Sequence, residues 1–582
     1  MQKKEDGISS KKNSSIFSLV LSYKVLIALL IFFTISASLV SLIAPKIIAH
    51  GIDSYTNGNF KPQQLLLEFA GVAFFVLIFT YLQNIVQTYA SEKVGHDLRK
   101  DLAHTISLQS YTFVQQITPA TLLTNLSSDV DAVKVFVSQA IGMIIASVCL
   151  IIGTSVLLIM TNWELGLAVL TMVPIIAGAF FTIMGRIRKL FLQTQAIIDW
   201  LNKVINESIL GAGLIRVLNA EQYEGKKFLK ANTDARNIGL EILRYFAILI
   251  PIITFVTSSA TILIISLGGH FVIIDKMTLG DLTAFNSYVG ILVFPIIMIG
   301  FMTGLISRSS ASYDRIKTVL YNKPSNPSGN IPADLQGNIE VSHISLKLGG
   351  KDILKDISFT IKPKSKTAII GPTAAGKTQL LYILHGLIQP DQGEILYDET
   401  PLSHLNTDTF YQQIGFVFQD SIIFNTSIYE NIAFAETIQE NDVKKAITSA
   451  ELTDLISSLP KKLDTVVSER GASLSGGQKQ RIMLARALSL NPRILLLDDF
   501  TARVDTITEK EIIKNIGKNY PDLTLISVTQ KISSIVNYDQ IILLMEGEII
   551  ASGTHTELME TSPEYVQLYN SQHSTNYYEL HT

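Results

Sequence analysis

Six apolar segments, each long enough to cross a lipid bilayer as a helix, constrain this chain more than any other feature. The hydrocarbon layer is ~30 Å thick and takes a helix of about 20 residues. Buried helices of a large soluble protein are the alternative, but stretches such as ASVCLIIGTSVLLIM carry no charge on any face. We predict membrane-spanning helices with approximate limits at Val25–Ala44, Phe69–Ile85, Ile141–Met160, Leu165–Met184, Phe246–Leu267 and Tyr288–Ile306.

The composition agrees with a multidomain membrane protein. At 582 residues the chain exceeds one ordinary domain of about 100–200 residues. Only 17% of its residues are charged, against about a quarter in soluble domains, and the mean hydropathy is +0.33. Lys and Arg (47) nearly balance Asp and Glu (50), so no global field would attract a nucleic acid, and none is expected as a partner. The single cysteine, Cys149, excludes a disulfide within the chain.

The basic residues predict the orientation of the spans, because Lys and Arg near span ends are retained in the cytoplasm. Ten basic residues lie between Arg186 and Arg244, whereas the loops at about 50–64 and 268–285 contain only Lys61 and Lys276. The N-terminal segment contains Lys3, Lys4, Lys11 and Lys12. No small-residue cleavage site follows the first span, so we expect that span to be retained. We predict a multi-pass protein of the plasma membrane with both termini in the cytoplasm.

Two connections on the cytoplasmic side, at about 86–140 and 185–245, are longer than a turn between helices requires. Both mix apolar and charged residues at helical spacing. We predict that the spanning helices continue past the bilayer by about 25 residues, or almost 40 Å, far enough to touch another domain. The tips are expected near Gln116–Thr124 and Gly211–Ala220. Solvated hairpins without a docking role are the alternative.

The second half of the chain has the pattern of a soluble α/β domain. A stretch rich in Pro, Asn, Ser and Gly follows the last span, and short β-branched runs then alternate with helical segments. We therefore place a transmembrane domain at 1–320, a linker at 321–336 and the α/β domain at 337–582.

A glycine-rich loop in this domain fits the pattern GxxxxGK[ST], between a predicted strand and a predicted helix. Its backbone N–H groups can wrap a phosphate, the lysine can reach the β and γ oxygens, and the threonine hydroxyl can bind Mg²⁺. The residues of the loop are Gly371, Pro372, Thr373, Ala374, Ala375, Gly376, Lys377 and Thr378.

Two carboxylates, Asp498 and Asp499, follow the apolar strand ILLL. An acid at the carboxyl end of a buried strand is what a phosphate-bound Mg²⁺ needs, so Asp498 is the candidate metal ligand. Asp499 lies where a base that orients water would lie. Without the phosphate loop, a turn or a helix cap would be the simpler interpretation.

A second anion-binding surface is predicted where a serine and two glycines open the helix QKQRIMLARAL. It consists of Leu474, Ser475, Gly476, Gly477 and Gln478. One nucleotide cannot satisfy both surfaces within one compact domain. We therefore expect two domains arranged head to tail, with each γ-phosphate held between them.

Together, GPTAAGKT, LSGGQKQRIMLARAL, ILLLDD and the six spans resemble the ATP-binding cassette exporter half-transporters. The segments LSSDVDAV, GLIRVLNAEQ and SSASYDRI also resemble landmarks of that family. The resemblance implies a six-helix α transmembrane domain of the exporter type, followed by an α/β P-loop nucleotide-binding domain that uses ATP and Mg²⁺. It also implies that Gln419 senses the metal and the docking hairpins, and that the loop from Ala502 to Asp505 crosses the dimer interface.

Four positions depart from the pattern of that family. Asp499 replaces the usual Glu after the magnesium ligand, and Gln530 replaces the switch histidine, so it cannot carry a positive charge. Leu348 stands where an aromatic residue would stack on adenine, and Ala374 replaces a glycine of the phosphate loop. Loss of an interaction made only in the transition state costs ~100–1000-fold in rate, so we expect weak catalysis at this site.

The signature segment is intact, and it serves the site built on the opposite subunit. This asymmetry resembles the degenerate subunit of heterodimeric bacterial multidrug-type exporters. We therefore expect a distinct second half-transporter as partner and export of an amphipathic or lipophilic small molecule or lipid across the bilayer. A homodimeric lipid or drug exporter with slow ATPase activity, and a nucleotide-binding regulatory subunit without transport, are the alternatives.

Overall fold

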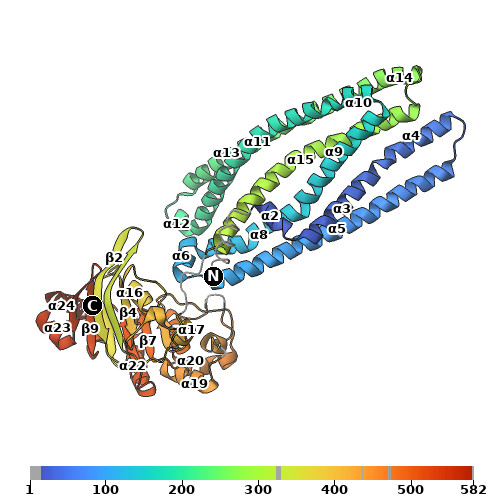
Figure 1. The fold of residues 1–582 in the computed structure, drawn as a ribbon. Helices are drawn as coiled ribbons and strands as arrows, with labels where there is room; N and C mark the ends of the chain where they lie inside the picture. Colours follow the sequence, from blue (N-terminus) through green and yellow to red (C-terminus); the bar gives the residue numbers. More distant parts are fainter. Residues whose placement is uncertain (1–14, 323–328, 436, 469–470, 472, 580–582) are drawn as a thin grey trace. The chain divides into compact units, whose positions relative to one another are not determined.

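The computed structural model describes residues 15–322, 329–435, 437–468, 471 and 473–579, and side chains at all of these except 192 and 573–579. The four N-terminal lysines and part of the predicted linker lie outside the described residues. The chain forms two compact units (Figure 1). The first comprises Met1–Leu108 and Ile117–Lys323, and the second comprises Gln109–Gln116 and Pro324–Thr582.

The described part of the first unit consists of helices and the turns between them, and the prediction of six spanning helices is confirmed. Its helices long and apolar enough to cross a membrane are Lys24–Thr56, Pro62–Ser107, Pro119–Thr161, Trp163–Leu210, Glu221–Ile273 and Leu279–Leu320. Their elements are α3 (Lys24–Ser41), α4 (Ile43–Thr56), α5 (Pro62–Ser107), α7 (Pro119–Thr124), α8 (Val130–Val135), α9 (Ile141–Thr161), α10 (Trp163–Leu170), α11 (Met172–Leu210), α13 (Glu221–Leu263), α14 (Gly269–Ile273) and α15 (Leu279–Leu320). Shorter helices of this unit are α2 (Ile16–Leu21) and α12 (Ala212–Val217), whereas α6 (Tyr111–Ile117) belongs, except for its last residue, to the second unit.

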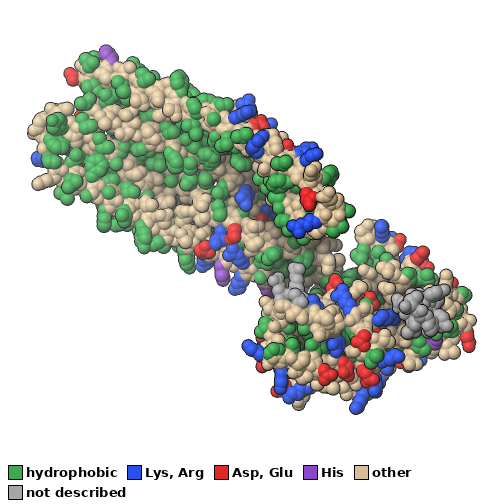
Figure 2. Space-filling view, turned by 180° about the vertical axis from the view of Figure 1, so that it is seen from behind, with side chains coloured by type: hydrophobic (Ala, Val, Ile, Leu, Met, Phe, Trp, Pro, Cys, Tyr) green, Lys and Arg blue, Asp and Glu red, His purple; other side chains and the backbone are tan. Residues whose placement is uncertain are grey.

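The helical unit exposes far more apolar surface than a soluble protein tolerates. The apolar window of α5 has no buried residue, and its Phe74, Leu77 and Tyr81 are all at least 60% exposed. Figure 2 shows hydrophobic side chains covering much of the helical unit, with Lys and Arg gathered toward one end of its helices. Lipid is the solvent that matches such a surface.

Several helices extend well beyond a bilayer thickness, as the sequence predicts. At 1.5 Å per residue, the 46 residues of α5 and the 43 of α13 span roughly twice the hydrocarbon layer. The second tip lies where it was predicted, because α11 ends at Leu210 and α13 begins at Glu221. The first tip lies about five residues earlier than expected. Its short helix is Tyr111–Ile117, and the following helix begins at Pro119, after Thr118 with φ of 70°.

Two of the resembling segments of the first half bind each other. Asp129 of LSSDVDAV is buried and accepts hydrogen bonds from the guanidinium of Arg315 in SSASYDRI, with an Nε to Oδ2 distance of 3.0 Å. Ser309 of α15 also donates to the carbonyl oxygen of Ala132 at 2.7 Å. A buried carboxylate needs such a partner, so this ion pair fixes the end of α15 against the helix that follows the first tip.

The second unit contains two sheets. One is antiparallel in the order β2-β1-β4-β5, and the other has the order β10-β9-β3-β8-β7-β6, parallel except for β10. The strands are β1 (Ile339–Leu348), β2 (Lys351–Ile361), β3 (Lys366–Ile370), β4 (Gln392–Tyr397), β5 (Thr400–Pro401), β6 (Ile414–Val417), β7 (Ile494–Asp498), β8 (Thr524–Val528), β9 (Gln540–Met545) and β10 (Glu548–Gly553).

Helices complete this α/β unit. They are α16 (Lys377–Leu384), α17 (Thr407–Tyr411), α18 (Ile428–Ile432), α19 (Glu440–Ser449), α20 (Thr453–Ser458), α21 (Gly476–Leu488), α22 (Thr506–Asn519), α23 (His555–Thr561) and α24 (Pro563–Glu579). The strands β3, β7 and β8 are almost completely buried, which explains why they read as continuous apolar runs. One core lies between the two sheets around α16, and another lies between the parallel sheet and α21 and α22.

Candidate nucleotide site

The predicted chemical groups meet because four parallel strands end at one edge of the six-stranded sheet. The strands β3, β8, β7 and β6 are consecutive neighbours in that sheet. The phosphate loop directly follows β3, and Asp499 directly follows Asp498, the last residue of β7. Gln530 and Gln419 are each the second residue after their strands, β8 and β6. The carboxyl edge of a parallel sheet is where open α/β folds bind ligands.

The phosphate loop has the backbone of an anion cradle. Gly376 has φ of 96° and directly precedes α16, so the first N–H groups of that helix face the loop. The Lys377 ammonium donates to the carbonyl oxygens of Gly371 at 2.9 Å and Pro372 at 2.7 Å. Burial lowers the pKa of Lys377, an effect that Asp499 and Asp498 oppose. A phosphate in the loop would supply the anionic partner that this lysine lacks.

Ala374 departs from the preferred conformation of its residue type. Its φ is 66°, in the left-handed region that favours glycine. A non-glycine residue there costs roughly 1–2 kcal/mol. Ala374 therefore adopts a conformation that a glycine would take without strain.

Asp498 and Thr378 form the part of the site that fits Mg²⁺. The Thr378 hydroxyl donates to Asp498 Oδ1 at 3.1 Å, while the second oxygen, Oδ2, is buried without a hydrogen-bond partner among the described residues. Burial raises the pKa of Asp498 to about 6, and the neighbouring Asp499 adds to that effect. Asp498 is only 1% exposed, so a buried oxygen without a partner is costly there. A hard cation such as Mg²⁺, which binds oxygen ligands, would supply that partner.

Asp499 lies beside this pair in the left-handed backbone conformation, with φ of 48°. Burial raises the pKa of its carboxyl, and the charges of Lys377 and Lys531 and a hydrogen bond from the Gln419 side chain lower it. Asp499 and Gln419, predicted separately from the sequence, are therefore in contact. The Asp499 side chain is one methylene shorter than a glutamate side chain would be.

Gln419 is also tied to the signature helix of the same chain. The side chain of Gln480, on α21, is buried and donates from Nε2 to the Gln419 carbonyl oxygen at 2.9 Å. Gln480 was not among the predicted site residues. Only its place in the segment QKQRIM pointed to it.

The other two departing residues lie on exposed parts of the chain. Gln530 is exposed on the loop after β8, and its backbone carbonyl accepts a hydrogen bond from the Gln572 side chain. Leu348 ends β1 and is 37% exposed, next to the turn at Gly349 and Gly350. Leu348 presents an aliphatic surface without a π face.

The amino end of α21 forms the second predicted surface. Ser475 and Gln478 make a capping box, in which the Gln478 Oε1 accepts from the Ser475 N–H at 2.8 Å and the Ser475 Oγ accepts from the Gln478 N–H at 3.3 Å. The box leaves the N–H groups of Gly476 and Gly477 without a partner inside the helix. Leu474, which precedes the cap, packs partly buried against the core.

The loop from Ala502 to Asp505 lies close to this helix end and requires glycine at position 477. A Cβ on Gly477 would lie 2.7 Å from the Arg503 carbonyl oxygen, and one on Gly476 would lie 3.2 Å from the Arg503 Cδ. Asp505 is exposed and caps α22 by accepting from the Thr508 N–H at 2.9 Å, which lowers its pKa. Ser475 and Asp505 therefore both cap helices in this chain.

An aromatic cluster connects the first tip segment with α16. Tyr111, whose segment Gln109–Gln116 belongs to the second unit, packs edge to face on Tyr382 at a centroid distance of 5.3 Å. Tyr382 in turn contacts Phe416 and Phe418, and Phe418 directly precedes Gln419. The sequence pattern gave no signal for this cluster.

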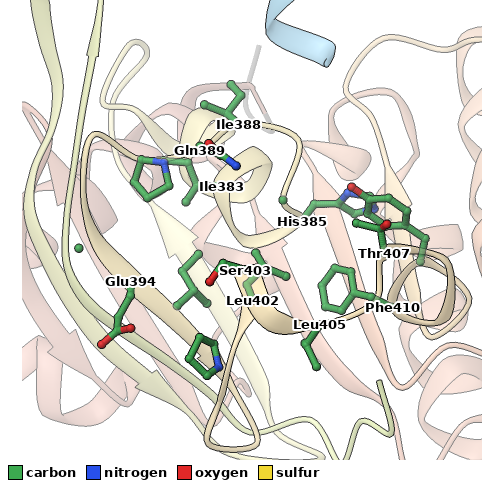
Figure 3. Close-up of a pocket in the computed structure, with 16 residues that line it drawn as sticks. Ile383, His385, Ile388, Gln389, Glu394, Leu402, Ser403, Leu405, Thr407 and Phe410 are labelled. Atoms are coloured by element: carbon green, nitrogen blue, oxygen red, sulfur yellow. The ribbon is translucent and has the colours of Figure 1, made fainter. Parts of the chain in front are cut away.

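A separate cavity of about 290 Å³ lies beyond the end of α16, with Ile383, Leu402 and Phe410 in its lining (Figure 3). The His385 ring, also part of the lining, stacks on Tyr411 at 5.0 Å. Its Nδ1 is buried with no hydrogen-bond partner in the part of the chain that the structure describes, and burial lowers the pKa of His385 to about 4. None of the residues predicted to bind nucleotide lines this cavity.

Comparisons with known proteins agree with this arrangement. The family described as "ABC transporter transmembrane region" matches residues 27–296, and the family described as "ABC transporter" matches residues 354–502. The chain is similar to the uncharacterized ABC transporter ATP-binding protein YfiB of Bacillus subtilis (strain 168), with 33% identity over 84% of this chain and 86% of that protein. It is also similar to the multidrug resistance-like ATP-binding protein MdlA of Escherichia coli (strain K12), with 28% identity over 92% of each chain.

Among solved structures, a bacterial Atm1-family ABC exporter with ATP bound has a TM-score of 0.79 to this chain. That comparison covers 93% of this chain and 98% of the other, at 23% identity. At that identity the likeness concerns the fold alone.

Proposed function

This chain belongs to the ABC transporter family and is one half of an ATP-driven exporter dimer, and we propose that its partner is a different half-transporter. In this proposal the pair hydrolyses ATP mainly at the site formed by the partner's phosphate loop and this chain's Ser475 end. The site on Lys377 binds ATP and releases it slowly. Both termini lie in the cytoplasm, and the pair moves its cargo out of the cytoplasm or the inner leaflet.

The observation that carries the proposal is the unequal state of the two phosphate surfaces. The amino end of α21 has its capping box, its two glycines and a close contact with Arg503. The carboxyl edge of the sheet has a shortened Asp499, an uncharged Gln530 and a strained Ala374. In a head-to-tail dimer these two surfaces belong to different nucleotide sites, so one site would be complete and the other weak.

The weak site still has the parts needed to bind nucleotide. The phosphate loop with Lys377 would hold the phosphates, and Thr378, Asp498 and Gln419 would hold Mg²⁺, which would neutralise part of their charge. Bound ATP would then favour the closed dimer, while hydrolysis at the other site resets it. Such a division assigns conformational bias and chemistry to different sites.

We further propose that the tip segment Gly211–Ala220 of this chain docks on the nucleotide-binding unit of the partner subunit, and that an aromatic patch of this chain receives the partner's corresponding tip. The tip of this chain has three exposed apolar residues, each at least 64% exposed: Leu214, Val217 and Leu218. On the nucleotide-binding unit, Phe424 and Phe434 stack at 4.8 Å under Arg486 and are also exposed. Burying two exposed apolar surfaces of this kind against each other lowers the free energy of the complex.

The proposed cargo is an amphipathic or lipophilic compound. Within the predicted spans no Asp, Glu, Lys or Arg is available to bind an ionic group. The helical core presents aromatic rings instead, including Phe180, Phe246 and Phe301, whose ring centroids lie 5.6 to 6.4 Å apart in two contacts. The multidrug resistance-like description of the relative MdlA supports this substrate class.

The test is to find where the pair cleaves ATP. The tagged chain is purified with the half-transporter that accompanies it, turned over with photoreactive ATP and vanadate, and mapped by proteolysis. Trapped product is expected on the partner's phosphate loop, with intact nucleotide beside Lys377. Trapped product mainly beside Lys377 would overturn the proposal.

Two other outcomes would replace it by a different function. Robust Mg²⁺-dependent turnover and transport by the chain alone would indicate a homodimeric exporter. Failure of the reconstituted pair to move any fluorescent amphipathic dye would indicate a regulatory subunit.

A further inference from the structure

The backbone around Gln530 is held by one side chain from the C-terminal helix. The Nε2 of Gln572, on α24, donates to the Gln530 carbonyl oxygen at 2.6 Å. The Oε1 of the same amide accepts from the Ile532 N–H at 3.0 Å. The two bonds hold the backbone on either side of Lys531, so this one amide restrains the loop from the switch residue onward.

The helix that carries Gln572 is itself firmly attached. The ring of Tyr565, on α24, is fully buried and attaches the helix by its packing, while its hydroxyl also bonds to His555 Nδ1 at 2.7 Å. Gln572 follows Tyr565 by two helical turns, so both lie on the face that α24 turns toward the core. Leu568, between them, also packs on that core. The amide therefore reaches the loop from a fixed support.

The opposite side of the loop is held by groups near the nucleotide site. Lys531 donates from its ammonium to the Thr501 carbonyl oxygen at 2.9 Å and from its backbone N–H to the Thr529 hydroxyl at 3.0 Å. Thr501 follows Asp499 by two residues. The loop thus lies between the carboxylate side of the site and α24, and loss of the Gln572 amide would release one of these two supports.

We propose that Gln572 is a positioning residue of the nucleotide site, which sets the backbone of the switch residue and so the reach of its side chain toward the γ-phosphate. A catalytic group must be held within about 0.5 Å of its productive position, and two hydrogen bonds to the flanking backbone supply that restraint. The inference rests on the proposed role of residue 530. It adds that the C-terminal helix belongs to the ATPase machinery.

Amide hydrogen exchange tests the contact without any ATPase activity. In the full chain, Gln572→Met removes both bonds at nearly constant volume, while Gln572→Glu keeps the acceptor for the Ile532 N–H. We expect the Ile532 amide to exchange about 3–10-fold faster in Gln572→Met and to stay protected in Gln572→Glu. Tyr565→Phe, which removes the His555 bond on the same helix, is the matched control and should leave Ile532 protected.

Turnover tests the positioning role in a chain whose own site has been made competent by Asp499→Glu and Gln530→His. The carbonyl that Gln572 binds belongs to the backbone and survives these changes. In the purified pair, Gln572→Met should lower kcat of this site about 3–10-fold and leave KM for ATP within about 2-fold. Gln572→Glu should give an intermediate kcat, and Tyr565→Phe should give an unchanged one.

The outcomes separate this inference from the proposed function. Unchanged Ile532 exchange in Gln572→Met, or an equal loss of kcat in Tyr565→Phe, would overturn the positioning role. A competent-site background that shows no gain in turnover would instead count against the asymmetric dimer, and the exchange experiment would still decide the role of Gln572 in holding the loop.

Discussion

The carboxyl edge of the parallel sheet and the amino end of α21 both present backbone N–H groups to phosphate, yet they differ in what surrounds those groups. At the sheet edge the phosphate loop depends on neighbours supplied by four strands, and several of these neighbours depart from the family pattern. At α21 everything lies within one capping box and one contact with Arg503. A site assembled from many segments can lose its catalytic groups one at a time and still bind phosphate. A helix end has few groups, so the loss of one removes its phosphate binding.

The largest expected effect is at the helix end. Ser475→Arg removes the cap and fills the anion site, so the ATPase activity of the assembled pair should fall ~100-fold or more. Steady-state phosphate release from the purified pair measures it. Ser473→Ala, on an exposed neighbouring serine, is the control and should leave the rate unchanged. Near-normal turnover in Ser475→Arg would mean that the two surfaces do not divide their roles as proposed.

A smaller effect is expected from Asp499 at the sheet edge. Asp499→Ala should lower turnover of the pair only modestly, because this carboxylate serves the weak site. Conversely, Asp499→Glu combined with Gln530→His should raise product formation beside Lys377 about 10–100-fold, since it restores a longer carboxylate and a titratable imidazole. Vanadate trapping resolved by subunit measures both. A severe loss in Asp499→Ala would contradict the comparison.

The third prediction concerns pH, to which the sheet edge should respond and the helix end should not. Burial raises the pKa of Asp498 to about 6, and Mg²⁺ binds the ionised carboxylate. Mg²⁺-dependent nucleotide binding beside Lys377 should therefore weaken about tenfold per pH unit below 6. For the stability of the nucleotide-free protein, the effect of low pH has the opposite sign. Because the folded pKa exceeds the ordinary 3.8, protonation of Asp498 favours the folded state at low pH, and that contribution is lost as pH rises through about 6.

Isothermal titration between pH 5 and 8 measures this dependence, with Asp498→Asn as the control in which the protein's own contribution is removed. An equal slope in the two proteins would exclude Asp498 as the titrating group.

The smallest effect is expected at Ala374. Ala374→Gly relieves the positive φ but loosens the unfolded chain, so the net gain should be about 0.5 kcal/mol, or a rise of about 1–2 °C in Tm. Thermal unfolding of the full chain without nucleotide measures it. Ala375→Gly is the matched control. That residue has no positive φ and is buried, so the same substitution there should lower Tm.

The sequence predicted the fold well because its signals are long or periodic. The six apolar runs identified the spans, and the length and helical spacing of the cytoplasmic connections predicted that the helices continue beyond them. The first tip was misplaced because Thr118 and Pro119 were not read as the start of a helix. In the soluble half, the phosphate loop and the residues Asp498, Asp499 and Gln419 lay at or just after predicted strands, and the topology then brought those strands together.

What could not be predicted depends on contacts between distant parts of the chain. Gln480 and Gln572 have no distinguishing local pattern, and their partners lie 61 and 42 residues away. The packing of Tyr111 on Tyr382 joins residues that no periodicity relates. Nor could the conformation of Ala374 be known before its φ was seen, although the missing glycine was noticed.

The hydrogen bond from Gln480 to the Gln419 carbonyl couples the two nucleotide-binding surfaces of one subunit, the amino end of α21 and the sheet edge. Helix α21 would bind the nucleotide held by the opposing subunit. Its second turn is hydrogen-bonded to Gln419, the residue beside Asp499. Motion of that helix as the dimer opens would pull directly on the metal side of this chain's own pocket. Nucleotide bound at one site would then affect the other site through α21 and this hydrogen bond, within one polypeptide.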